Sequence, residues 1–537
     1  MSLFRRLLTR PKLRAQGSEP RPIVSIPTTV TILSFLRRRW IASSLMMVVL
    51  LIGLGYLAWW APWQKCGPGM AATGSPYVCV GLNLDSTALR DADPLADLEQ
   101  TIADNNRAIS EPFATIVVLD DMTPDPRSDS VAIQQQRHVI EGAITAASRA
   151  NDPKTGGIPK IKLLLANYGL EAGSWPQAVD AIEQARLREH IVAVTGIGQS
   201  RDTSRAAVAS LSDAHIAVVG TNVTGDTMNF APGPGGKRSA NFFRVVPTNT
   251  EEAIAASKYI KQHNYHKVLL VNDVNETDGY AQILAHAFAT NGDVKVDNTE
   301  PYRSPDAPLS VATREQLMAK IFADMHSDIC AIRPDLIYFA GRGTDLGYFL
   351  TALSSSGACG LGPLDVMTGD DASNLVGGRI STSGGLSFNV FYTALAYTDE
   401  WSSFPPNSDY VKNYRDFAAA FTEKRFKDAN LDDGDVMVSY DAVNVAITAT
   451  KADPLATTEP NTVADFLVAI HCQHYVPGAS GPIALGPDGN PIDKAMPILQ
   501  LHADGTVTQK DLAWPTGQPL DPTSTCYPNT EPQRVPR

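Results

Sequence analysis

Short apolar runs alternate with longer segments of helical period between residues 114 and 354. The runs at 115–119 (TIVVL), 191–194 (IVAV) and 336–340 (LIYFA) lack the polar–apolar alternation of half-exposed strands. Such runs are typical of a parallel sheet that is covered on both faces. The segments between them repeat apolar residues three and four positions apart, as helices packed on a sheet do. This order predicts an α/β protein with doubly wound sheets.

The same periodicities place the individual elements. Strands are predicted at 115–119, 162–165, 191–194, 216–219, 267–272 and 336–340. Helices are predicted at 134–150, 175–188, 203–212, 251–263, 280–291, 314–326, 346–354, 410–426 and 439–450. Near the C-terminus, apolar runs flank Gly-Pro-Asp-Gly-Asn and Ala-Asp-Gly, and these turn residues predict a β-hairpin.

The strand–helix pattern forms two successive blocks, 112–245 and 246–375, followed by a mixed region with further helices. Residues 63–111 show no clear period and are interpreted as a stalk or N-terminal cap. Residues 516–537 are interpreted as a C-terminal tail. A length of 537 residues suggests about three compact units, or fewer large ones.

An uncharged stretch near the N-terminus predicts a membrane anchor. Residues 41–60 carry no charge and have the length that a helix needs to cross a bilayer. Three arginines at 37–39 precede the stretch, and aromatic residues at 56–60 end it. The pattern predicts a transmembrane helix over 41–62 and a cytoplasmic tail over 1–40, with all later residues extracytoplasmic.

Two other interpretations of the N-terminus are a cleaved signal peptide and a lipid anchor at Cys66. A signal peptide would need an n-region of 40 residues, and its apolar core would be unusually long. The residues before Cys66 (WQK) lack the small side chains that lipoprotein processing prefers. The sequence therefore favours an uncleaved single-pass anchor.

Charge is distributed unevenly along the chain. Nine of the 45 Lys and Arg residues and one of the 57 Asp and Glu residues lie in 1–40, so the rest of the chain has a formal net charge of −20. A basic head on an acidic body fits a chain whose parts lie on opposite sides of a membrane. An acidic body argues against a nucleic-acid partner. The composition, 44% hydrophobic and 19% charged, excludes a disordered or fibrous protein.

All six cysteines follow the predicted anchor, where an oxidising compartment favours disulfides. Six cysteines allow 15 pairings. Their order suggests three pairs that each close a modest loop: Cys66–Cys79, Cys330–Cys359 and Cys472–Cys526. A zinc site at His471-Cys472-Gln473-His474 is the alternative, but no second ligand pair at the usual spacing accompanies it.

Five segments in order resemble the type I periplasmic solute-binding proteins, the family of branched-chain amino-acid-binding proteins and receptor ligand-binding domains. They are 216–228 (IAVVGTNVTGDTM), 241–248 (NFFRVVPT), 258–292 (beginning KYIKQHNYHKVLLVND), 439–443 (SYDAV) and the terminal hairpin. The resemblance covers about residues 112–515. It implies two Rossmann-like lobes: 112–245 with about 376–470 as lobe 1, and 246–375 with about 471–515 as lobe 2.

The resemblance also implies a ligand cleft between the lobes. In lobe 1, Gln199 and Ser200 fall on the loop where the family binds a carboxylate. Asn222 and Thr224 fall where the family uses a main-chain carbonyl and a Thr hydroxyl.

In lobe 2, Tyr280 matches the family's Tyr that packs on the ligand. Asp371 falls where amino-acid binders place an acid for the ligand's ammonium group. Arg342 departs from the aromatic residue common at its position, and it indicates either an anionic group in the ligand or a salt bridge across the cleft. If Arg342 and Asp371 both face the cleft, a zwitterionic ligand is expected.

No catalytic motif stands out, and we expect no enzyme, cofactor or metal. The segment 341–347 (GRGTDLG) has the wrong spacing for a dinucleotide loop, and prolines interrupt the Gly-rich 232–236. The resemblance implies a membrane-tethered extracytoplasmic protein that binds a small polar, amino-acid-like solute for ABC-type import or sensing. Its partners would be an ABC permease or a signalling protein. The alternatives are a ligand-free interaction module on the same fold and an extracytoplasmic enzyme.

Overall fold

The computed structural model describes residues 44, 46–51, 66–74, 77–124, 130–154, 156–169, 173–305, 309–382, 384–427 and 429–519. The chain divides into two compact units, Met1–Gln64 and Lys65–Arg537.

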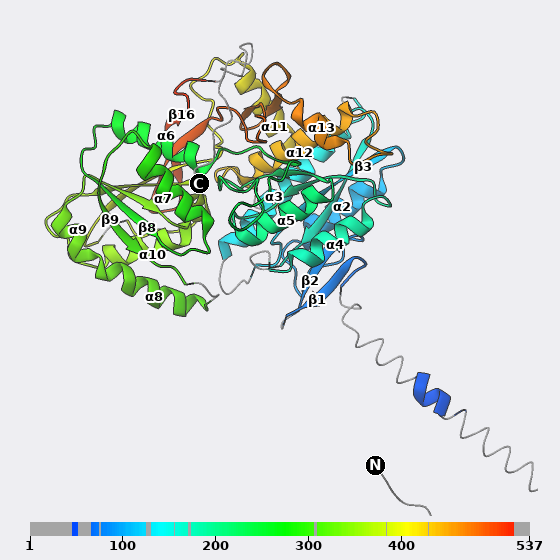
Figure 1. The fold of residues 1–537 in the computed structure, drawn as a ribbon, viewed down its shortest axis with the longest axis horizontal. Helices are drawn as coiled ribbons and strands as arrows, with labels where there is room; N and C mark the ends of the chain where they lie inside the picture. The colour runs from blue at the N-terminus through cyan, green and yellow to red at the C-terminus, as the bar shows by residue number, and fades with distance from the viewer. Residues whose placement is uncertain are drawn as a thin grey trace, which may run out of the picture. The chain divides into compact units, whose positions relative to one another are not determined.

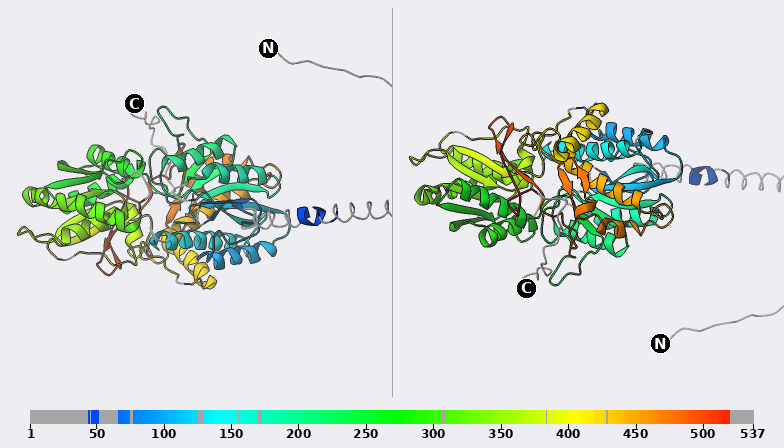
Figure 2. Two further views of the ribbon diagram at one scale, coloured as in Figure 1. Left: turned by 90° about the horizontal axis from the view of Figure 1, so that it is seen from below. Right: turned by 90° about the horizontal axis from the view of Figure 1, so that it is seen from above.

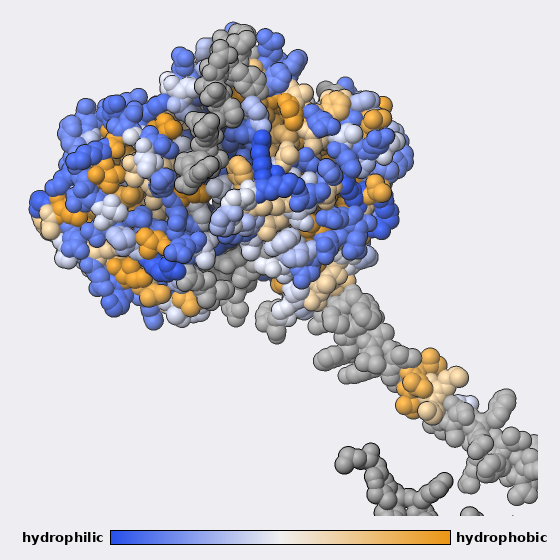
Figure 3. All heavy atoms as spheres, viewed as in Figure 1, coloured by the Kyte–Doolittle hydropathy of each residue, from blue (hydrophilic) through white to orange (hydrophobic). Residues whose placement is uncertain are grey.

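The first unit contains the predicted anchor. Residues 46–51 are helical, and each of their apolar side chains is more than half exposed (Figure 3). Within the described part of the chain, no helix has both the length and the apolar character needed to cross a membrane. The predicted span at 41–62 lies mostly outside the described residues, and the predicted tail at 1–40 lies wholly outside them.

The second unit contains two lobes, each built on a seven-stranded sheet (Figure 1). The first sheet has the order β1-β2-β4-β3-β5-β6-β7. Its strands are β1 Met70–Thr73, β2 Val78–Asn83, β3 Phe113–Asp120, β4 Lys160–Asn167, β5 Ile191–Gly196, β6 Ala217–Gly220 and β7 Phe242–Arg244. The strands from β4 to β7 are parallel, whereas β2 runs antiparallel to β4 and to β1.

Helices cover both faces of the first sheet. One apolar core lies under α2 Ala96–Arg107, α3 Ser130–Ala150, α11 Asp409–Lys424, α12 Asp435–Ala452 and α13 Val463–Val468. The core of the other face lies under α4 Trp175–Ala185 and α5 Asp202–Asp213. The predicted strands lack alternation because both of their faces are buried.

The second sheet has the order β16-β15-β12-β11-β10-β8-β9. Its strands are β8 Val268–Asp273, β9 Val296–Tyr302, β10 Leu336–Ala340, β11 Leu364–Thr368, β12 Phe388–Thr393, β15 Met496–Leu501 and β16 Val507–Ala513. One face packs on α6 Asn249–Gln262 and α7 Gly279–Asn291, and the other on α8 Val311–Asp324, α9 His326–Ile332 and α10 Gly343–Ser354. Figure 2 shows the two helix-covered sheets side by side.

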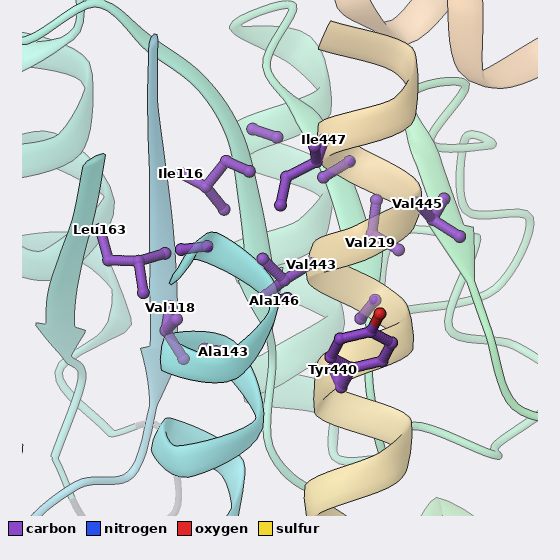
Figure 4. Close-up of a cluster of buried hydrophobic side chains, with 14 of the residues drawn as sticks. Ile116, Val118, Ala143, Ala146, Leu163, Val219, Tyr440, Val443, Val445 and Ile447 are labelled. Carbon is purple, nitrogen blue, oxygen red and sulfur yellow. The ribbon is translucent and has the colours of Figure 1, made fainter. Parts of the chain in front are cut away.

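The helix α12 is the central element of the first lobe. Its side chains Val443 and Ile447 belong to the same apolar core as Ile116 of β3 (Figure 4). Close approach to α3 depends on Gly142, because a Cβ there would lie 2.3 Å from the carbonyl oxygen of Val436. The predicted helix at 439–450 is therefore confirmed and extended by one turn at its N-terminus.

The predicted stalk or cap at 63–111 differs from the structure. The strands β1 and β2 extend the first sheet, and α2 packs on its core. Local periodicity missed this arrangement because β2 is placed by pairing with β4, whose residues lie far along the chain.

The lobe boundaries after residue 375 also differ. The strand β12, within the predicted lobe 1 segment 376–470, belongs to the second sheet. The hairpin of β13 Val476–Gly478 and β14 Gly481–Ile483, within the predicted lobe 2 segment 471–515, contributes to the core under α12. The chain crosses between lobes at positions that have no compositional signal.

The disulfides Cys66–Cys79 and Cys330–Cys359 are formed as predicted, with Cα atoms 5.5 and 5.6 Å apart. Cys472 is also disulfide-bonded. Its predicted partner Cys526 lies outside the described residues. A disulfide sulfur lacks the thiolate that the alternative zinc site would require.

Candidate ligand-binding cleft

A cavity of about 260 Å³ lies between the two lobes, lined by residues from both. Its walls come from the loops that follow β3, β5 and β6 in lobe 1 and β8, β10 and β11 in lobe 2. In open α/β sheets, these carboxyl ends of strands form the crevice where ligands bind. All seven predicted ligand residues line the cavity: Gln199, Ser200, Asn222, Thr224, Tyr280, Arg342 and Asp371. Their roles in binding remain predictions.

The guanidinium of Arg342 lies at the centre of the lobe 2 wall. It donates to both carboxylate oxygens of Asp278 (2.6 and 2.8 Å) and to Oδ1 of Asp371 (3.3 Å). It also lies over the ring of Tyr280, 4.6 Å from the centroid. Its contact with lobe 1 is to the carbonyl oxygen of Ser200 at 3.4 Å. The charge of Arg342 is therefore paired within lobe 2.

The ion pair shifts the pKa values of its members. Burial acts to raise the pKa of Asp278, but the charge and hydrogen bonds of Arg342 outweigh burial and lower it. Burial acts to lower the pKa of Arg342, yet Asp278 and Asp371 raise it overall. Both groups are thus held in their charged forms.

Helix N-termini hold the acids of the lobe 2 wall. Asp278 caps α7 by accepting hydrogen bonds from the backbone N–H groups of Tyr280 and Ala281. Asp371 accepts from the backbone N–H of Gly343 at the start of α10, over 2.7 Å. The backbone N–H of Asp371 in turn donates to the Tyr280 hydroxyl. Capping therefore fixes the side chains that orient Arg342.

The predicted residues of lobe 1 are held by neighbouring loops. Ser200 Oγ accepts from the backbone N–H of Gly225 at 2.9 Å. Gln199 Oε1 accepts from Arg201. Asn222 donates to Asp435 Oδ1 at 2.6 Å, at the first turn of α12. Each side chain is oriented before any ligand arrives.

A hydrogen bond between two side chains joins Thr224, a predicted residue of lobe 1, to lobe 2. Thr224 Oγ1 donates to Asp370 Oδ1 over 3.5 Å. The carbonyl oxygen of Thr224 accepts from the backbone N–H of Asn249, where the chain enters α6. Thr224 therefore lies where the lobes meet.

A family model described as periplasmic binding protein matches residues 125–506 of the chain. The chain belongs to the periplasmic binding protein family. The match covers segments of both lobes and the cleft-lining residues of this periplasmic binding protein from Gln135 onward, but not those of the loop after β3.

Solved structures show the same type I fold. An ABC transporter substrate-binding protein from Desulfitobacterium hafniense, in complex with Leu, has a TM-score of 0.53 and 18% identity, covering 74% of this chain and 99% of that one. The branched-chain amino acid transporter substrate-binding protein from Streptococcus pneumoniae, in complex with isoleucine, has a TM-score of 0.53 and 15% identity, covering 75% and 99%. A solute-binding protein from R. palustris, in complex with benzoate, has a TM-score of 0.51 and 14% identity, covering 74% and 96%. The search of curated proteins by sequence found no match.

The structure adds five carboxylates to the cleft of this periplasmic binding protein that the sequence did not single out: Asp120, Asp121, Asp278, Asp370 and Asp435. Asp120 ends the apolar run of β3, and Asp278 lies two residues before the predicted Tyr280. Both positions can be recognised in the sequence as candidates for the cleft. Asp435 reaches the cleft because α12 packs against the first sheet, which no local pattern indicates.

Proposed function

We propose that this periplasmic binding protein captures a small polar, amino-acid-like solute between its lobes for ABC-type import or for sensing. The observation that carries the proposal is the cavity itself, whose lining comes from the carboxyl ends of strands in both sheets. A volume near 260 Å³ lies just below the usual range for small-molecule pockets, which suits a small solute. The relatives in complex with Leu and isoleucine support an amino-acid-like ligand.

We infer a binding role and not a catalytic one. The described lining contains no histidine, cysteine or lysine. Of its four serines, Ser200 accepts a backbone hydrogen bond at its hydroxyl and accepts from the Arg342 guanidinium at its carbonyl oxygen. A ligand-free interaction module is disfavoured because apolar side chains do not fill the cleft.

Ligand-dependent thermal unfolding of the full-length chain in detergent tests the binding proposal. The panel contains neutral and basic amino acids, diamines, aromatic carboxylates and sugars. A ligand at 100 times its Kd should add about 2.7 kcal/mol of stability, which raises Tm by about 2–4 °C or less for so large a unit.

The matched variants are Thr224→Val in the cleft and Thr290→Val on the exposed surface of α7. We expect the first to weaken the ligand-induced shift and the second to preserve it. A folded protein whose Tm responds to no compound would contradict solute binding.

We further propose that residues 41–62 anchor the protein in the membrane, with the lobes extracytoplasmic. The support is the uncharged stretch at 41–60, the arginines at 37–39 and the helical, exposed apolar residues at 46–51. Membranes from cells that make the full chain are washed with alkaline carbonate. Retention with an intact N-terminus by mass spectrometry is expected, and release or a processed N-terminus would contradict the anchor.

A further inference from the structure

The charges that line the cleft are unequal. The described lining includes six carboxylates and three guanidinium groups. The carboxylates are Asp120, Asp121, Asp278, Asp370, Asp371 and Asp435, and the guanidinium groups are Arg201, Arg314 and Arg342.

Two of the arginines are already paired with acids. Arg342 is paired with Asp278 and Asp371. Arg314 is paired with Asp345, a fully buried carboxylate behind the cleft wall, over 2.5 Å. Neither of these charges remains for a negatively charged ligand.

Three other carboxylates have no cationic partner among the residues that the structure describes. Asp120, Asp370 and Asp435 are 2%, 7% and 4% exposed, and within the described part of the chain none of them forms an ion pair. Burying a charge without a partner is unfavourable, so each would gain from a nearby cation. Burial raises the pKa of Asp120 and of Asp370 to about 7. Asp120 and Asp435 belong to lobe 1 and Asp370 to lobe 2, so a cation-bearing ligand that touches all three spans the cleft.

The hydrogen-bonding capacity of the cleft indicates the same chemistry independently. Gln136 Nε2 donates to Asp120 at 3.2 Å, and Asn222 Nδ2 donates to Asp435. Since a carboxylate accepts, these bonds fix the orientation of both amides. Gln136 Oε1 and Asn222 Oδ1 are then buried acceptors with no donor among the described residues. Both side chains line the cavity, and Gln136 is 7% exposed. N–H groups of a bound ligand would satisfy these two acceptors.

We propose that the cleft selects a small solute of net positive charge with two ammonium or guanidinium groups, the class that contains diamines and basic amino acids. This inference rests on the proposed solute-binding function. One positive group would contact Asp120 and Asp435 with the two amide oxygens, and the other would contact Asp370. The relatives in complex with Leu and benzoate carry a zwitterion and an anion, so this cleft would differ from theirs in charge preference.

Isothermal titration calorimetry of the full-length chain at pH 8 with EDTA tests the inference. The probes are arginine, lysine, 1,4-diaminobutane, leucine and benzoate. We expect the first three to bind at least tenfold more tightly than the last two. Asp120→Asn and Asp370→Asn should each weaken their binding tenfold or more, whereas Asp504→Asn on the exposed β15–β16 turn should not change it.

Each other outcome has a distinct meaning. Binding of leucine or benzoate without the diamine would overturn the cationic preference and keep solute binding. Binding of no probe by folded protein would contradict both proposals. Cationic binding that both Asn variants leave intact would overturn the role of these carboxylates. A response to Zn²⁺ alone without EDTA, lost in His138→Ala, would instead assign the charge to a metal at His138, Asp433 and Asp435, whose ligand atoms lie within 4.8 Å of one another.

Discussion

Arg342 and Asp278 form a bidentate ion pair on the wall of the cleft, with hydrogen bonds of 2.6 and 2.8 Å. Both side chains are nearly buried, and both belong to lobe 2. The sequence indicated that Arg342 either meets an anionic group of the ligand or forms a salt bridge across the cleft. The structure shows ion pairing within one lobe, so the guanidinium stiffens the site and leaves ligand charge to other residues.

Replacing Arg342 with methionine should destabilise the protein by about 3–5 kcal/mol, because it leaves Asp278 buried without its cation. Urea unfolding of the full chain measures this loss. The double variant Arg342→Met with Asp278→Asn should recover part of it. Arg333→Met removes an exposed guanidinium that contacts carbonyl oxygens, and it should cost well under half as much. Equal losses for Arg342→Met and Arg333→Met would contradict the importance of the buried pair.

Gly198 packs tightly beneath the lobe 1 wall. A Cβ at this residue would lie 2.5 Å from the Tyr168 hydroxyl and 2.6 Å from Asp120 Oδ1, and its φ is +60°. Gly198→Ala should therefore displace Asp120 and weaken ligand binding as well as stability. Gly235→Ala is the matched control, since its φ is +68° but open space surrounds it.

Both Gly variants have the backbone cost of a positive φ, about 1 kcal/mol. The difference between their Tm values isolates the steric effect. Gly198→Ala with the same Tm and the same ligand affinity as Gly235→Ala would contradict the packing described here.

Arg244 joins three segments at the edge of the first sheet. Fully buried, it donates to the carbonyl oxygens of Val223 and Gly225 and to Asn490 Oδ1, at 2.7 to 2.9 Å. A lysine cannot reproduce this planar set of donors. Arg244→Lys should cost about 2–4 kcal/mol in urea unfolding, from charged hydrogen bonds worth roughly 1.5–3 kcal/mol each. Arg238→Lys is the control, because Arg238 is exposed and contacts Pro487 in the same loop as Asn490.

Asp120 should make stability depend on pH. Burial is the main cause that raises its pKa to about 7, whereas an unfolded aspartate titrates near 3.8. The folded protein therefore binds the proton more tightly, and its stabilisation is full below about pH 4 and is lost as the pH rises through about 7. Such a shift corresponds to at most about 4 kcal/mol.

Tm measured from pH 4 to pH 8 tests this dependence. Asp120→Asn should flatten the decline toward high pH and be relatively more stable at pH 8. An unchanged pH profile in Asp120→Asn would show that other groups set the slope. Asp370, whose pKa burial also raises to about 7, should account for part of the remaining decline.

The apolar patterns predicted β3, β5 and β10 because burial on both faces leaves an uninterrupted apolar run in the sequence. The strand β9 has no such signal. It pairs with β8 at the edge of the second sheet, and most of its side chains are exposed or partly exposed. An edge strand is defined by its backbone pairing, which polar side chains do not reveal.

The sequence by itself predicted the two α/β blocks and suggested two of the disulfides, and its resemblance to the family implied the seven side chains that line the cleft. These side chains lie together because loops after parallel strands meet at one edge of a sheet. Tertiary structure alone decided which side chains already have partners. Pairing Arg342 with Asp278, and bringing Asp435 of α12 beside Asn222, depends on contacts between segments far apart in sequence. The charge state of a buried group depends on its neighbours. The position of the cleft could therefore be predicted from the sequence, whereas its charge follows from the fold.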